Sequence, residues 1–252
     1  MRRELRAEWT KLRTVPGAGR LLLALITLTV AAGIALTASV TCPWGRCTQD
    51  AVKLSLTGVQ LGQAFVAMLA VQLISGEYGT GMIRTTLTAM PRRATVLTAK
   101  ATLLTGLTLA GGTVAVLASV LAGGLILPAR GYPPLSLTDG PTLRAAIGSI
   151  LYLALIALLS LGIATTVRDS AAAIGAVLGL LYLFPIIVLL TPDPDWQRLM
   201  WSISPMNAGL AIQATTGLST LPLSPWAGLA VLAAWAAAAL LAGGLAFRRR
   251  DA

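Results

Sequence analysis

The chain has 252 residues, of which 56% are hydrophobic and only 11% are charged, and its formal net charge is +10. A soluble domain of this length needs more polar surface than such a composition supplies, so a water-soluble fold is excluded. The sequence contains no histidine, which removes Ser-His-Asp and Cys-His catalysis, haem ligation by histidine and the common zinc sites. We therefore expect no enzyme active site, no metal site and no cofactor on this chain.

Amphipathic spacing distinguishes the N-terminal segment. Leu5, Trp9 and Leu12 recur at helical intervals, and arginines and lysines surround them. This pattern predicts an interfacial helix that ends at Pro16. Such a helix could anchor the chain on anionic membrane lipid or transmit force to the rest of the protein.

Six long stretches without a charged residue follow. About 20 helical residues cross a ~30 Å hydrocarbon core. We expect an all-α polytopic membrane protein, one domain over residues 1–252, with six transmembrane helices. The expected spans are 21–40, 54–76, 102–127, 146–167, 171–191 and 226–247.

The basic residues predict how the spans are oriented. Alternate hydrophilic segments hold 14 lysines and arginines, against 5 in the others. The positive-inside rule places the richer set, which includes both termini, in the cytoplasm. This placement also explains the net charge without nucleic acid as a partner.

The first outer loop contains both cysteines of the chain, Cys42 and Cys47. The cell exterior permits oxidation, so a small disulfide loop is expected, with two free thiols as the alternative.

Inside the second span, Gln60 and Gln63 share one helical face. They could line a transport pathway or bond to a neighbouring helix. Small residues recur four apart and indicate close helix packing, within the chain rather than in a dimer interface. These pairs are Gly58 and Gly62, Ala118 and Ala122, and Gly175 and Gly179.

No acidic or basic residue is expected deep in a span, which argues against a proton- or sodium-driven carrier. Residues 199–217 are uncharged but too polar and broken for a seventh span. We expect an outer-face interfacial or partly re-entrant helix there.

The cytoplasmic segment 77–100 has patterning that topology does not require. Ile83, Leu87 and Met90 fall at i, i+4 and i+7, and Pro91 follows. A short helix with one apolar stripe is predicted. Its face could rest on lipid headgroups or in a groove of a cytoplasmic protein.

No lysine of the chain stands in a phosphate-binding loop. Lys11, Lys53 and Lys100 are followed by Leu, Leu and Ala rather than by Ser or Thr. The chain therefore lacks the usual ATP-binding loop, and powered transport would need another chain as the motor.

Three motifs occur in a characteristic order: Glu8 to Arg13, then Glu77 to Arg84 with Pro91 to Arg93 and Lys100, and finally Arg248 to Asp251. Together they resemble the permease subunits of type-2 ATP-binding-cassette exporters, in particular the six-span permeases of actinobacterial genomes.

The resemblance implies a half-transporter in the bacterial plasma membrane. Two permeases would pair, as a homodimer or a heterodimer, and cytoplasmic ATPase subunits would bind ATP and magnesium beneath them. The cargo would be a small hydrophobic or amphipathic compound. A secondary carrier without an ATPase, and a membrane immunity or structural protein, are the alternatives.

In this family the 77–100 segment corresponds to the coupling helix that contacts the ATPase, and Leu5 to Arg13 to the elbow-like interfacial helix. The coupling residues that the resemblance implies are Glu77, Tyr78, Gly79, Thr80, Met82, Ile83, Arg84, Leu87, Pro91 and Arg92.

Overall fold

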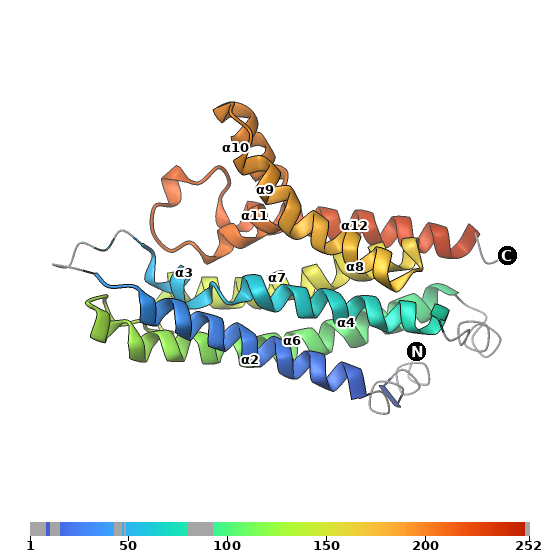
Figure 1. Ribbon diagram of the computed structural model, residues 1–252, viewed down its shortest axis with the longest axis horizontal. Coiled ribbons are helices and arrows are strands. Elements are labelled where there is room, and N and C mark those ends of the chain that lie inside the picture. The colour runs from blue at the N-terminus through green and yellow to red at the C-terminus, as the bar shows by residue number, and fades with distance from the viewer. Residues whose placement is uncertain (1–8, 11–15, 43–46, 48, 80–92, 250–252) are drawn as a thin grey trace.

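The computed structural model describes residues 9–10, 16–42, 47, 49–79 and 93–249. These residues form a bundle of long helices (Figure 1). Among them, six helical segments are long and apolar enough to cross a membrane. The prediction of an all-α polytopic protein with six spans is confirmed.

The first four spans consist of α2, α3 continued by α4, α6 and α7. The fifth consists of α8, η3 and α9, and the sixth is α12. The bounds are α2 Pro16–Ser39, α3 Ala51–Leu56, α4 Val59–Gly79, α6 Arg93–Ile126, α7 Gly140–Val167, α8 Ser170–Leu178, η3 Gly179–Leu183, α9 Phe184–Leu189 and α12 Pro225–Arg249.

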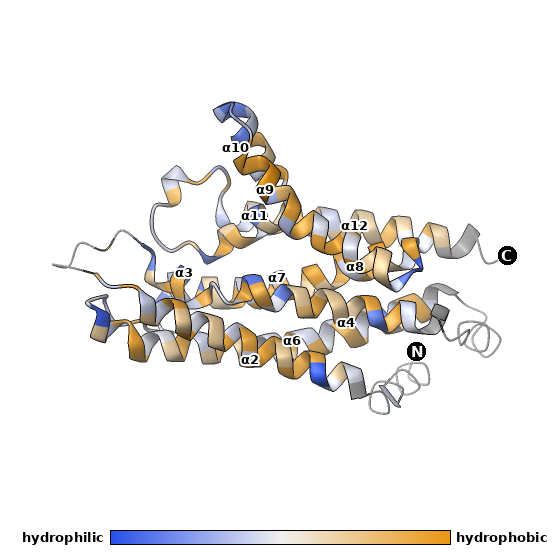
Figure 2. Ribbon diagram, viewed as in Figure 1, coloured by the Kyte–Doolittle hydropathy of each residue, from blue (hydrophilic) through white to orange (hydrophobic). Residues whose placement is uncertain are grey.

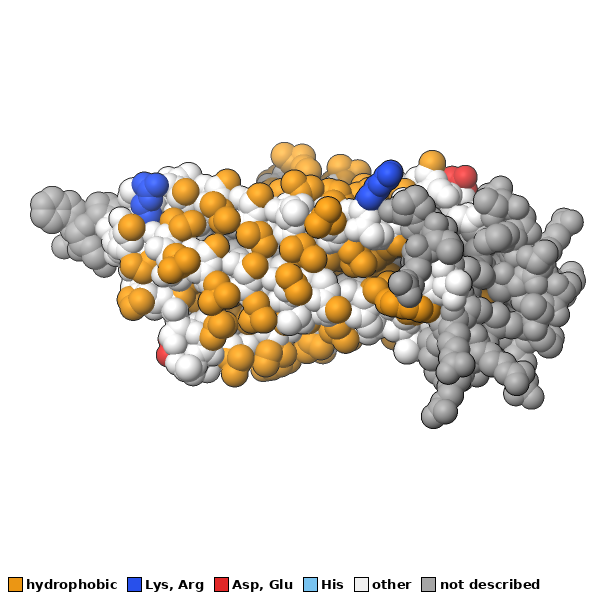
Figure 3. Space-filling view, turned by 90° about the horizontal axis from the view of Figure 1, so that it is seen from below, with side chains coloured by type: hydrophobic (Ala, Val, Ile, Leu, Met, Phe, Trp, Pro, Cys, Tyr) orange, Lys and Arg blue, Asp and Glu red, His pale blue; other side chains and the backbone are white. Residues whose placement is uncertain are grey.

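The second and fourth spans form the centre of the bundle. In each of them 67% of the span is buried, against 22% in the first, fifth and sixth spans. The helices are hydrophobic along much of their length (Figure 2), and apolar side chains cover much of the face seen in Figure 3. Exposed leucines such as Leu28 on α2 and Leu121 on α6 suit contact with lipid tails.

Glycines allow the closest helix contacts. A Cβ on Gly58 would lie 1.9 Å from the Thr29 carbonyl oxygen, and one on Gly62 would lie 2.2 Å from the Thr29 hydroxyl. The α2 and α4 backbones can approach only because these side chains are absent. The predicted packing role of this pair within the chain is confirmed.

The other glycine pair behaves differently. A Cβ on Gly175 or Gly179 would meet no atom within 4 Å. Packing within the chain was the wrong prediction for this pair, because no part of the chain that the structure describes packs closely on these two glycines.

Two predicted boundaries need correction. The second span begins at Ala51 and is broken at Thr57 and Gly58, and α6 begins at Arg93, so residues 93–100 are helix rather than loop. The helices therefore continue past the uncharged stretches and include charged residues. Lys100 does so because its side chain is buried against α4.

The expected helix over residues 199–217 is several short pieces. They are α10 Pro194–Ile203, α11 Pro205–Leu210 and the 3-10 turn η4 Ala211–Gln213. Ser204 is extended, with ψ 124°, because Pro205 disfavours a helical residue before it.

The ends of the bundle differ in content. The start of α2, the end of α4, the start of α6 and the end of α12 lie at one end, called the terminal end below (Figure 1). The opposite end contains Cys42 and the 3-10 turn η2 Pro128–Arg130, and is called the disulfide end.

Candidate functional site

A buried hydrogen-bond cluster connects the central helices. The Tyr152 hydroxyl of α7 donates to Oε1 of Gln63 on α4, and Nε2 of Gln63 donates to Sδ of Met206 at 3.3 Å. Gln63 and Tyr152 are 0% exposed. The structure shows the Gln63 side chain bonded to neighbouring helices, and its role in lining a transport pathway stays a prediction.

Gln60 has a separate partner in the fifth span. The Tyr182 hydroxyl donates to the Gln60 backbone carbonyl. Tyr182 lies in η3, a π-helical turn, and Pro185 follows at the start of α9. π turns are rare and often mark functional sites, and both features weaken the regular helix ladder. The fifth span is therefore bonded to α4 at the place where it is least regular.

The segment between the fifth and sixth spans folds back into the bundle at the disulfide end. None of α10 is buried, whereas Pro205, Met206 and Leu210 of α11 are. Gly228 of α12 permits this contact, because a Cβ there would lie 2.0 Å from the Ala208 carbonyl oxygen. The segment thus combines an exposed helix, α10, with a buried part, α11 and η4, which is called the re-entrant part below because it folds back into the bundle. Its depth in a membrane stays a prediction.

Polar contacts fasten the re-entrant part to α7 and α12. The Arg144 guanidinium donates to the Ala214 carbonyl at 2.5 Å, and the Gln213 amide donates to the Ser149 hydroxyl at 3.1 Å. The Trp235 indole donates to the Ile203 carbonyl at 2.9 Å. These contacts pair several polar groups of the segment inside the protein.

Asp50 fastens the same segment to the second span. Its carboxylate caps α3 by accepting from the N–H groups of Val52 and Lys53 at 3.1 and 3.2 Å. It also accepts from the Thr215 hydroxyl at 2.8 Å and from the N–H groups of Thr215 and Thr216 at 2.5 and 3.0 Å.

Two opposing effects act on this carboxylate. Burial alone would raise the pKa of Asp50, but hydrogen bonds, led by those from Thr215, outweigh it and hold the pKa below its usual value. Asp50 is thus a charged tether between residues 165 positions apart in the chain.

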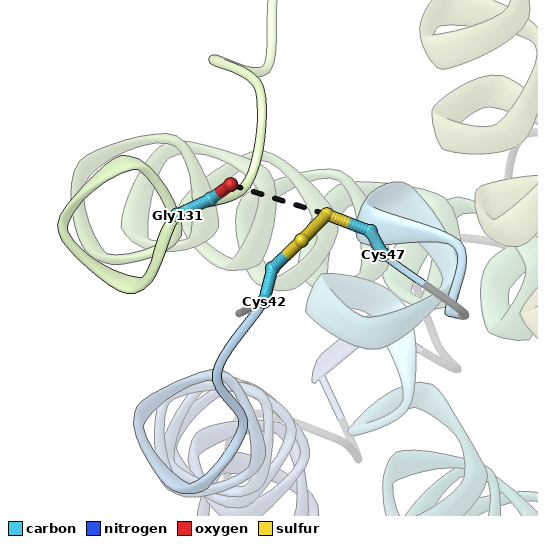
Figure 4. Close-up of a disulfide and its surroundings, with 3 residues drawn as sticks. All are labelled: Cys42, Cys47 and Gly131. Carbon is cyan, nitrogen blue, oxygen red and sulfur yellow. Dashed lines mark hydrogen bonds between the residues drawn. A yellow bond between two sulfur atoms is a disulfide. The ribbon is translucent and has the colours of Figure 1, made fainter. Parts of the chain in front are cut away.

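Cys42 and Cys47 are joined by a disulfide (Figure 4). The Cys42 N–H donates to the Arg130 carbonyl at 2.8 Å, and Sγ of Cys47 lies 3.9 Å from the Gly131 carbonyl oxygen. Gly131 has φ +86°, and a Cβ there would lie 2.6 Å from the Cys42 carbonyl oxygen. The loop after α2 is therefore held against the turn after α6, and glycine is required at the contact.

The terminal end contains a buried cation that the sequence analysis placed in a loop. Lys100 is 1% exposed, and its ammonium donates to the Leu73 carbonyl of α4 at 3.1 Å. Arg168, which directly follows α7, has φ 67° and donates to the Ala246 carbonyl of α12 at 3.2 Å. Helix-to-helix contacts hold this end together.

Most of the residues expected to contact an ATPase lie outside the described ranges. These are Thr80, Met82, Ile83, Arg84, Leu87, Pro91 and Arg92, and the same is true of Leu5 and Leu12. Glu77, Tyr78 and Gly79 form the end of α4, and Trp9 is helical and 45% exposed. Both the coupling assignment and the interfacial helix stay predictions.

Sequence reasoning passed over Asp50, Tyr152 and Tyr182. An aspartate directly before an apolar run is a typical N-cap signal and could have identified Asp50. A tyrosine within a membrane span needs a hydroxyl partner, which marks both tyrosines as members of a polar cluster, although not which partner each one finds.

A family described as ABC-2 family transporter protein matches the chain over residues 49–252. The match covers α3 to α12, and therefore five of the six spans. No curated protein sequence matches the chain.

Proposed function

Because this chain belongs to the ABC-2 transporter family, as a multi-pass membrane permease that is not itself catalytic, we propose that it is the membrane subunit of an exporter driven by a separate ATPase. The observation that carries this proposal is the family match on a six-span bundle without a phosphate-binding loop. Two permeases would pair, and the ATPase subunits would supply ATP and magnesium.

We assign the terminal end to the cytoplasm of a bacterial plasma membrane. Arg20, Lys100 and Arg168 are among the described cations at that end, and the segment 80–92 between α4 and α6, which lies outside the described ranges, contains Arg84 and Arg92. The disulfide end would face the cell exterior, where oxidation of cysteines is favoured.

A route for force follows from the contacts. An ATPase pushing on the 80–92 segment would act on the end of α4 and the start of α6 together, because the Lys100 ammonium fastens α6 to α4. From α4, Gln63 reaches α7 and α11, and Gln60 reaches η3. Movement at the cytoplasmic end would thus reach the re-entrant segment at the outer end, and a small hydrophobic or amphipathic cargo would leave there.

Co-purification with the ATPase encoded beside the gene tests this function. The wild-type chain in lipid nanodiscs should retain the ATPase and show cargo-stimulated hydrolysis. The double variant Ile83→Asp/Leu87→Asp should lose at least tenfold in coupled transport while inserting normally, because it removes the apolar stripe.

Leu218→Asp supplies the matched control, since Leu218 is an exposed leucine in the turn η5 Leu218–Thr220 of the disulfide end. It should leave ATPase binding unchanged. A chain that never retains an ATPase, or a double variant that transports normally, would overturn the assignment.

A further inference from the structure

A small cavity lies at the disulfide end between the start of the second span and the segment that precedes α12. Its volume is about 100 Å³. Its lining joins residues from α3, α4, α10, α11, η4 and the loop after η5. They are Lys53, Gln60, Trp201, Ser202, Asn207, Ala208, Leu210, Ala211, Leu221, Pro222 and Leu223.

A larger hollow of about 450 Å³ adjoins this cavity, and Lys53 and Leu221 line both. Ligand sites in proteins commonly have volumes of about 300–1,000 Å³. The small cavity alone suits a headgroup or a short chain, whereas the two together have room for a drug-sized molecule.

Two of the polar groups that line the small cavity are donors without an acceptor among the described residues. Nδ2 of Asn207 is buried and has no hydrogen-bond partner. Within the ranges that the structure describes, the Lys53 ammonium makes no hydrogen bond or ion pair. Lys53 is exposed, so water can hydrate its ammonium. An unpartnered buried amide is costly, and the Asn207 amide therefore favours a ligand that accepts hydrogen bonds.

Asp50, the nearest carboxylate in the sequence, does not serve as that acceptor. Both of its oxygens already accept hydrogen bonds from the α3 N-terminus, Thr215 and Thr216. It lines the larger hollow but not the smaller one. The cation at Lys53 is thus available to an anion that enters the small cavity.

Apart from Gln60 and Ser202, the remaining walls are apolar. Leu210, Leu221 and Leu223 face the cavity together with Pro222, and Trp201 adds an aromatic side chain. A cationic and amide-lined corner beside leucines matches a molecule with an acidic head and an apolar body.

We propose that this cavity is an outer-face binding site for the anionic headgroup of an amphipathic molecule. The Lys53 ammonium and the Asn207 amide donate to its carboxylate or phosphate, and the leucines contact its apolar part. Exported cargo and anionic membrane lipid share this chemistry. The role as a cargo site rests on the proposed function, whereas the binding does not require an ATPase.

Binding to the full-length chain in phosphatidylcholine nanodiscs tests the site. The probe is dodecyl phosphate, with dodecyltrimethylammonium as the probe of equal chain length and opposite charge, and empty nanodiscs give the partition background. The wild type should bind dodecyl phosphate above the partition background. Its binding of dodecyltrimethylammonium should not exceed that background.

Lys53→Gln should weaken dodecyl phosphate binding about tenfold or more, because it removes a charge-assisted hydrogen bond. Asn207→Leu should weaken it about fivefold and leave the thermal midpoint equal or higher, because it deletes an unpartnered donor. Arg198→Gln is the matched control, since Arg198 is an exposed cation of α10 outside both hollows. It should bind as the wild type does.

Equal binding by Lys53→Gln, Asn207→Leu and Arg198→Gln would overturn the proposal, as would equal binding of the two probes. Nanodiscs containing phosphatidylglycerol separate the two sources of the headgroup: a lower apparent affinity for dodecyl phosphate supports lipid as the occupant, and an unchanged one supports cargo. Loss of ATPase co-purification with intact probe binding would refute the proposed function alone.

Discussion

The fourth and fifth spans are consecutive in the chain but are built in opposite ways. α7 runs unbroken for 28 residues, and 67% of the span is buried, whereas the fifth span has 20 residues, is 22% buried, and contains a π turn and a proline. α7 contacts its neighbours through glycines and hydrogen bonds. Among the described residues, none packs closely on Gly175 and Gly179 of the fifth span. We therefore infer that α7 is the more rigid of the two spans and that the fifth span can change its conformation more easily.

The strongest test of this contrast uses one substitution in both spans. Gly162→Leu in α7 should destabilise the protein by about 3 kcal/mol or more, because even a Cβ would lie 2.4 Å from the Ala239 backbone of α12. Gly175→Leu should change stability by less than about 0.5 kcal/mol. Thermal unfolding in nanodiscs measures both, and equal losses would abolish the distinction.

Removal of the Tyr152 hydroxyl should have the next largest effect. Tyr152→Phe leaves the buried Gln63 carbonyl without its donor, which costs about 1–3 kcal/mol. Adding Gln63→Leu should restore part of that stability, because both polar partners are then absent. A double variant less stable than Tyr152→Phe would show that the hydroxyl does not act through Gln63.

Tyr182→Phe should cost less, about 0.5–1.5 kcal/mol, because Tyr182 is only partly buried and its acceptor is the Gln60 backbone carbonyl. The loss should appear locally, as faster amide hydrogen exchange in the fifth span with unchanged exchange in α7. Faster exchange in both spans would mean that the fifth span is not a separate unit.

The smallest effect on stability at neutral pH is expected for Asp50, the charged tether to the segment that follows the fifth span. The pKa of Asp50 is lowered in the folded chain, so its stabilisation is complete above the unfolded value of about 3.9 and is lost as the pH falls through the folded value. The thermal midpoint of the wild type should therefore decrease when the pH is lowered below about 4. Asp50→Asn should flatten that dependence, and Asp139→Asn, at a cap without a side-chain hydrogen bond, should not. If the thermal midpoints of the two variants depended on pH in the same way, the Asp50 carboxylate would not stabilise the fold as this tether.

The number and approximate place of the spans could be predicted because charges are excluded from lipid but collect in connections. The same reasoning misplaced the start of α6, because Lys100 is buried against the Leu73 carbonyl and so behaves as part of the packed helix. Hydropathy describes the contact with lipid and does not detect a partner on another helix.

The hydrogen-bond cluster around Gln63 was likewise only partly predictable from the sequence. The sequence analysis gave Gln63 two roles, and only tertiary packing could bring Tyr152, 89 positions away, to its side-chain oxygen. The break at Gly58 and the π turn at Tyr182 do not alter hydropathy and were not predicted. The coupling residues were identified by resemblance and stay untested until an ATPase is bound.

The connection between α7 and α8 consists of Arg168 and Asp169 alone. Three consecutive Cα separations span about 11 Å at most, so Val167 and Ser170 cannot move farther apart than that. Whatever drives the fifth span away from α7, the gap between them can widen only toward the far end of α9, in the shape of a wedge. The length of one connection therefore decides the direction in which such a gap can open.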